Sequence, residues 1–142
     1  MNTYSVKLWS IVGIIGVFGA LCRWVIYLTL EQLLMVSSYI ATTIINLTGC
    51  FAMGFLLGSL SHHFVSDQGY LKYLSSSFVG SYTTFSTVIA DSSILFSGLS
   101  LLVPVFLLFC QTFLGLAAFK IARGFGRTIN NVSRTHSMKP ST

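Results

Sequence analysis

The residues best suited to chemistry lie in one polar stretch, residues 75–87, which reads SSSFVGSYTTFST. Gly80, followed by hydroxyl residues, predicts a break in a helix. Carbonyl groups freed by such a break can bind a small cation. The hydroxyls next to the break can donate hydrogen bonds to a dehydrated anion, and they belong to Thr83, Thr84, Ser86 and Thr87. The alternative is an intact helix whose hydroxyls bond to the preceding turn.

Three further side chains could act on an anion. Phe85 can present the positive edge of its ring. Asn46 lies in the middle of an apolar segment, where its amide either donates to an anion or makes an ordinary bond between helices. Arg23 either attracts anions or reaches out to the nearer membrane interface.

Other kinds of site lack support in the sequence. His62 and His63 next to Asp67 form a weak metal pattern, because no further ligand follows. No serine, histidine and aspartate pattern, carboxylate pair or phosphate loop occurs, so an enzyme is not expected. The basic C-terminal segment has only Phe125 as an aromatic residue, which argues against nucleic-acid binding and favours contact with an anionic membrane surface.

The elements that must position these residues are membrane-spanning helices. Hydrophobic residues make up 54% of the 142 and charged residues only 8%, with a mean hydropathy of +0.80. A bilayer core needs roughly 20 apolar residues per helix. We therefore predict an all-α membrane protein with four spans, at about residues 8–30, 39–60, 71–98 and 99–119. Residues 1–127 form the predicted spanning unit, and residues 128–142 are expected to be disordered.

Small residues and charges add two expectations. Close helix packing, either within one subunit or between two, is predicted from Gly13, Gly16, Gly19 and Ala20 in the first span and Gly54 and Gly58 in the second. With four spans, the side that holds both termini carries seven Lys and Arg residues, and the other side carries none. This bias predicts one fixed orientation in the cell membrane with both termini in the cytoplasm.

Three segments, one in each of the first three spans, resemble the Fluc (CrcB) fluoride channel family. They are GVFGALCRW (residues 16–24), INLTGCFAMG (residues 45–54) and GSYTTFSTV (residues 80–88). The resemblance covers roughly residues 8–125. It implies passive fluoride export through a dimer of antiparallel subunits with two pores.

The resemblance also implies roles for individual residues. Backbone carbonyls at Gly80 and Thr83 would bind a structural sodium ion that is not transported. Arg23 would lie near a pore vestibule. The fluoride path would be lined by Asn46, Thr84, Phe85, Ser86 and Thr87.

Departures from the family pattern raise the question of the partner. Val88 stands where the family has a second phenylalanine, Ile89 and Asp91 replace Ser and Glu, and Gln111 replaces a Ser in the fourth span. Because Val88 has no ring edge and the charge bias opposes insertion in both directions, we predict a heterodimer with an oppositely oriented paralogue. The alternatives are a homodimeric fluoride channel, a non-conducting scaffold subunit and a four-helix drug exporter. The exporter would need a carboxylate in the first span, which holds only Arg23.

Overall fold

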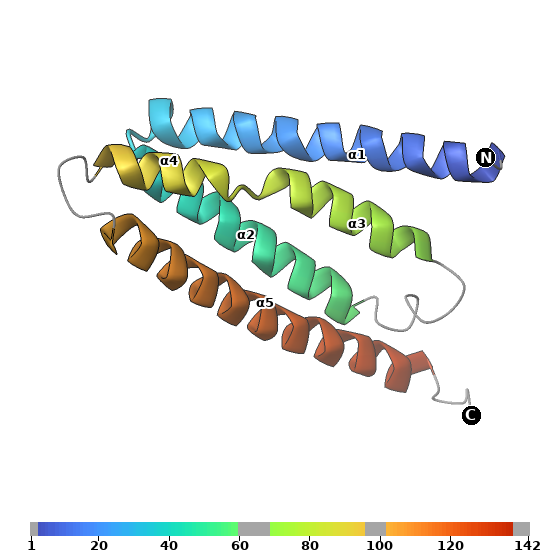
Figure 1. Cartoon of the computed structure of the whole chain (residues 1–142). Coiled ribbons are helices and arrows are strands. Elements are labelled where there is room, and N and C mark those ends of the chain that lie inside the picture. Colours follow the sequence, from blue (N-terminus) through green and yellow to red (C-terminus); the bar gives the residue numbers. More distant parts are fainter. Residues whose placement is uncertain (1–2, 60–68, 96–101, 138–142) are drawn as a thin grey trace.

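The computed structural model describes residues 3–59, 69–95 and 102–137, and within these ranges every regular element is a helix. The elements are α1 (Thr3–Leu28), the π-helical turn η1 (Thr29–Leu33), α2 (Ser38–Ser59), α3 (Gly69–Tyr82), α4 (Ser86–Leu95) and α5 (Leu102–Ser137). In Figure 1, α1 runs alongside α3, and α4 continues beyond α3. The contacts fall mainly into two pairs, α1 with α3 and α2 with α5.

Three helical segments are long and apolar enough to cross a membrane: Val6–Leu33, Ser38–Ser59 and Pro104–Asn131. They correspond to the first, second and fourth predicted spans. The chain is therefore an all-helical, multi-pass membrane protein. The turn expected at Ser97, Gly98 and Ser100 lies outside the described residues, as do His62, His63 and Asp67.

The third predicted span consists of two helices, α3 and α4, separated by a non-helical link at Thr83–Phe85. Figure 1 shows this link as a thin, uncoiled stretch of ribbon between the two helices. With 14 and 10 residues, the two helices are each too short to cross a bilayer core alone. The break follows Gly80 by three residues, and Gly80 itself remains helical.

Small residues bring α1 against α3. A Cβ at Gly19 would overlap the carbonyl oxygen of Phe78, and one at Gly16 would lie 3.1 Å from the Ser77 and Ser81 hydroxyl oxygens. The Ser77 hydroxyl also donates to the Val12 carbonyl at 2.7 Å, which adds a hydrogen bond between the two helices. Close packing and such bonds are what holds helices together in lipid.

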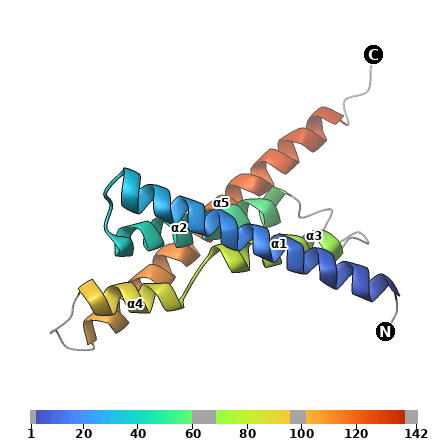
Figure 2. The ribbon, with the colours of Figure 1, turned by 90° about the horizontal axis from the view of Figure 1, so that it is seen from above.

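The glycines of α2 serve contacts within the subunit. A Cβ at Gly54 would overlap the carbonyl oxygen of Phe119, and one at Gly58 would overlap that of Arg123, both on α5. Of the two alternatives that the sequence left open for these glycines, the structure therefore shows packing within one chain. Figure 2 shows the resulting crossing of α5 beneath the other helices.

Helix α5 is longer than the predicted fourth span. It begins with Pro104 in its first turn, a position where proline costs no helical hydrogen bond, and it continues to Ser137. Its 36 residues correspond to about 54 Å, against about 30 Å for a bilayer core. The structure thus corrects the expectation of disorder from residue 128: residues 128–137 continue the helix, and residues 138–142 lie outside the described range.

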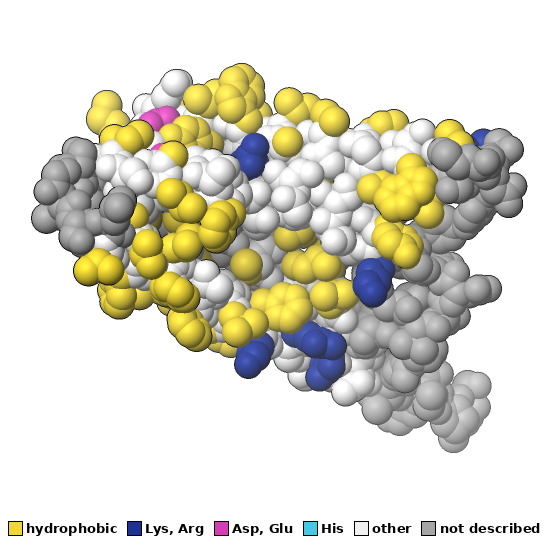
Figure 3. Space-filling model, in the orientation of Figure 1, with side chains coloured by type: hydrophobic (Ala, Val, Ile, Leu, Met, Phe, Trp, Pro, Cys, Tyr) yellow, Lys and Arg dark blue, Asp and Glu magenta, His cyan; other side chains and the backbone are white. Residues whose placement is uncertain are grey.

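The surface is largely apolar. Exposed large hydrophobic side chains occur along α1, α2, α4 and α5, as expected for a chain in lipid. Figure 3 shows hydrophobic side chains over much of one face, with the visible acidic side chains at the end where α1 passes into α2.

Candidate functional site

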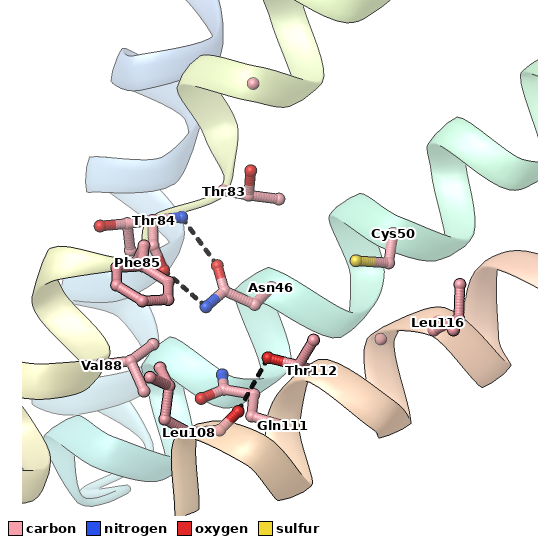
Figure 4. Close-up of a pocket in the computed structure, with 12 residues that line it drawn as sticks. Asn46, Cys50, Thr83, Thr84, Phe85, Val88, Leu108, Gln111, Thr112 and Leu116 are labelled. Atoms are coloured by element: carbon pink, nitrogen blue, oxygen red, sulfur yellow. Dashed lines mark hydrogen bonds between the residues drawn. The ribbon is translucent and has the colours of Figure 1, made fainter. Parts of the chain in front are cut away.

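The break in the third span is held by one side chain of α2. The Asn46 amide donates to the Thr84 carbonyl at 2.7 Å, and the Thr84 backbone N–H donates to the Asn46 amide oxygen at 2.8 Å. Irregular backbone at membrane depth persists only where its polar groups find partners. Asn46 supplies both partners for Thr84, and the dashed lines in Figure 4 mark these two bonds.

Glycine makes room for this arrangement. Gly49 lies about one helical turn after Asn46 on α2, and a Cβ there would overlap the Thr83 methyl group and approach the Tyr82 ring to 3.1 Å. The Thr84 hydroxyl then accepts from the Thr87 backbone N–H at 3.4 Å and caps the start of α4. Asn46, Gly49 and Thr84 together place the link against α2.

The last carbonyl groups at the end of α3 lose their regular helical donors at the break, and those of Gly80 and Thr83 are among them. The Thr84 N–H, which would bond to the Gly80 carbonyl in a continuous helix, donates to Asn46 instead. The Thr87 N–H would donate to the Thr83 carbonyl in a continuous helix, but here it donates to the Thr84 hydroxyl. The carbonyls at Gly80 and Thr83 thus retain accepting capacity at the C-terminal end of α3, where the helix dipole is negative.

A cavity of about 390 Å³ opens beside the break, between α2, the α3–α4 link and α5. Figure 4 shows its lining, with Asn46 pointing to the link and the α5 side chains lying opposite. Five of the residues that the sequence predicts for the site line this cavity, and they are Asn46, Gly80, Thr83, Thr84 and Phe85. Phe85 is 63% exposed, so its ring lies at the open side.

A second cavity, of about 170 Å³, lies between α1, α2 and the start of α4. It is lined by Arg23 together with Thr84 and Thr87, so Arg23 faces protein groups. Arg23 is half-buried. The predicted residues thus divide between two cavities that share Thr84, while exposed Ser86 lines neither of them.

Sequence reasoning missed two polar residues of α5 that line the larger cavity, Gln111 and Thr112. Gln111 departs from the family pattern in the sequence, and the structure places it at the site. A polar amide in the middle of an apolar span was the signal that could have identified it. Val88, the residue in place of a phenylalanine ring, also lines the cavity and is only 2% exposed.

A separate polar contact joins α2 to α4. The Thr42 hydroxyl donates to the Asp91 carboxylate at 2.6 Å, and both side chains are buried. Asp91 does not line the larger cavity, and the described residues that line that cavity include no carboxylate. The cavity beside the break is therefore free of negative side-chain charge.

These features define an all-helical membrane protein with a broken span beside an uncharged polar cavity. The chain also matches, over residues 10–123, the model of a family described as "CrcB-like protein, Camphor Resistance (CrcB)". The chain therefore belongs to the CrcB family.

Curated relatives support this membership. One is the "Fluoride-specific ion channel FluC" of Trichormus variabilis, 31% identical over 79% of this chain and 82% of the relative. "Fluoride-specific ion channel FluC 1" of Bacillus cereus is 35% identical over 56% of this chain and 58% of the relative. "Fluoride-specific ion channel FluC 2" of the same strain is 35% identical over 58% of this chain and 65% of the relative.

The match spans less than two thirds of the length of the Bacillus cereus relatives. No solved structure matches the chain. The relatives are named as ion channels, which confirms the expectation that the chain is not an enzyme.

Proposed function

We propose that this chain is a subunit of a fluoride channel in the cell membrane, which lets fluoride leave the cytoplasm passively and so lowers its concentration there. The observation that carries the proposal is the broken third span, whose link Asn46 holds against α2 beside a polar cavity without carboxylates. The names of the curated relatives support fluoride as the ion.

The cavity has the chemistry that a small anion needs. A dehydrated anion is stabilised by neutral donors, and the walls carry amide side chains without a competing negative charge. The exposed Phe85 ring can turn its positive edge toward the anion. The positive charge of Arg23, across Thr84 in the smaller cavity, raises the local concentration of anions.

A structural sodium ion fits the break. The carbonyls at Gly80 and Thr83 have lost their regular helical donors, and carbonyls of an interrupted helix are suitable ligands for sodium. When bound, the ion would supply a fixed positive charge beside the anion path without being transported. Asn46 and Thr84 hold the backbone in the conformation that presents these carbonyls.

The proposed assembly is an antiparallel heterodimer with a paralogue. The seven-to-zero bias of Lys and Arg favours one orientation of this chain, so an antiparallel partner has to be a different protein. Val88 offers no ring edge, and the partner would supply the missing ring to one pore. The occurrence of relatives named FluC 1 and FluC 2 in one Bacillus cereus strain is consistent with such a pair.

Fluoride efflux from proteoliposomes tests the proposal, first with this chain alone and then with the chain co-expressed with its paralogue. We expect efflux only from the pair, and we expect Phe85→Ile in this chain to stop it. Efflux from the chain alone would support a homodimeric channel instead of the heterodimer. Absence of fluoride efflux from both preparations would overturn the channel function and favour a scaffold subunit.

A further inference from the structure

Gln111 is a buried amide without a partner. Its side chain lies in α5 and is only 7% exposed, and neither its amide nitrogen nor its amide oxygen has a hydrogen-bond partner among the described residues. Exchanging the two amide atoms would not change this result, because both lack partners. Buried amide groups almost always have hydrogen-bond partners. The missing partners of Gln111 therefore indicate a bound ligand.

The side chain lines the larger cavity. Figure 4 shows Gln111 on the α5 wall near Val88, with Asn46 on the opposite side of the same space. Val88 is nearly fully buried and apolar, so it offers no donor there. A group bound at this part of the cavity would obtain its hydrogen bonds from Gln111.

The remaining polar side chains of the cavity already have partners. Thr83 and Thr112 each donate their hydroxyl hydrogen to a carbonyl four residues earlier in their own helix, at 2.9 Å in both cases. The Thr84 hydroxyl shares a hydrogen bond with that of Thr87, and Asn46 is engaged with the backbone of Thr84. Gln111 therefore holds the largest unused donor capacity among the described residues that line the cavity.

We propose that the Gln111 carboxamide is the main hydrogen-bond donor to a small inorganic anion in this cavity. An amide offers two N–H donors without a charge, and the cavity contains no carboxylate that would repel the anion. The inference rests on the proposed function for the identity of the anion, fluoride. It assigns a part of the anion site to α5, whereas the sequence predicts a fluoride path lined by residues of the second and third spans.

Two substitutions at Gln111 test the proposal. Gln111→Met keeps the length of the side chain and removes both donors, and Gln111→Glu places a negative charge at the same position. In the conducting preparation, we expect Gln111→Met to lower fluoride efflux about ten-fold to a hundred-fold, the factor for one lost hydrogen bond to a charged group. Gln111→Glu is expected to lower it further, because its charge repels the anion.

Thr128→Val is the matched control. It changes another residue of α5, outside the lining of the cavity, whose hydroxyl is bonded to the Gly124 carbonyl of its own helix. We expect its fluoride efflux to stay within about two-fold of the wild type. Equal efflux from wild type, Gln111→Met and Thr128→Val would overturn the inference while the proposed function stands.

Thermal unfolding separates binding from a purely structural role. Because an unpartnered buried amide costs stability, Gln111→Met should unfold at the same temperature as the wild type or higher when no anion is added. A lower unfolding temperature together with loss of the dimer would show that Gln111 bonds to the partner subunit, and this outcome would overturn the inference.

Anion titration keeps the inference testable if the wild type does not conduct. We expect sodium fluoride to raise the unfolding temperature of the wild type relative to sodium gluconate, and to raise that of Gln111→Met much less. This result without fluoride efflux would disprove the channel function and leave the anion site standing. Equal shifts for both proteins, or none, would overturn the anion site.

Discussion

At the scale of single residues, the carboxamide of Asn46 replaces both backbone partners that Thr84 loses at the break. The sequence left open whether Asn46 makes a bond between helices or donates to an anion. In the structure Asn46 makes the bond between elements. It also lines the cavity, where the second hydrogen of its amide group is not used in the bond to Thr84. Asn46 thus holds the link that the other proposed groups depend on.

Asn46→Ala should destabilise the subunit. It leaves the Thr84 N–H and carbonyl without partners in a partly buried position. We expect a loss of about 2–5 kcal/mol, since each unsatisfied buried group costs about 1–3 kcal/mol. Thermal unfolding of the purified protein in detergent measures this loss.

Thr43→Ala is the matched control for Asn46→Ala. Thr43 is also half-buried on α2, but its hydroxyl bonds to the Tyr39 carbonyl of the same helix. Removing it should change the unfolding temperature far less than Asn46→Ala does. If the two variants unfold at the same temperature, Asn46 is not what stabilises the break.

At the scale of helices, the subunit is built from two closely packed pairs, and glycine sets the approach in each. Gly19 brings α1 onto α3, and Gly54 and Gly58 bring α2 onto α5. The larger cavity lies where the second pair meets the broken span. Its width therefore depends on how closely α2 approaches α5.

Gly54→Ala should loosen the α2–α5 pair. The added methyl group would overlap the backbone of Phe119, which cannot move aside as a flexible side chain would. We expect a loss of about 1–3 kcal/mol in the free energy of unfolding, the usual cost of overpacking. Thermal unfolding, followed on the same scale as for Asn46→Ala, measures the effect.

Gly13→Ala is the control for that prediction. No described atom of another element lies within 4 Å of a Cβ at Gly13, and alanine favours a helix by about 1 kcal/mol over glycine. This variant should therefore be neutral or slightly more stable. Equal destabilisation by both substitutions would contradict the assignment of Gly54 to close packing within the subunit.

At the scale of the whole molecule, the distribution of charge predicts a single orientation. Glu31 lies in η1 at one end of the bundle, whereas α5 extends beyond the length of a bilayer core and carries Lys120, Arg123 and Arg127 in its second half. Because Lys and Arg are retained on the cytoplasmic side, the C-terminal end of α5 is expected there.

Labelling of single cysteines tests this orientation. In a background with Cys22, Cys50 and Cys110 replaced by alanine, a membrane-impermeant maleimide should label Leu34→Cys in intact cells. Arg127→Cys should be labelled only after the cells are permeabilised. Both native side chains are exposed, so access to the reagent depends on the side of the membrane.

Partial labelling of both cysteines in intact cells would contradict a fixed orientation. It would show insertion in both directions, which is what an antiparallel homodimer requires. The partner would then be a second copy of this chain, and the argument for a paralogue from the charge bias would fail.

The sequence by itself determined the class of protein and the approximate place of the site. Apolar segments of about 20 residues predict membrane helices because burying unpaired backbone groups in lipid is prohibitive. The run of hydroxyl residues after Gly80 predicted a break, which the structure places at Thr83–Phe85. The polar residues after Arg127 predicted disorder, whereas the structure continues the helix there. The polarity signals the end of the membrane and not the end of the helix.

Only the tertiary structure decided which of these residues come together. It joined Asn46 to Thr84, divided the predicted residues between two cavities and left Ser86 outside both. It also brought Gln111 of α5 to the wall beside Val88, although the two residues are 23 positions apart in the sequence. Local patterns report the preferences of single helices, whereas partners for a buried amide depend on which helices pack against each other.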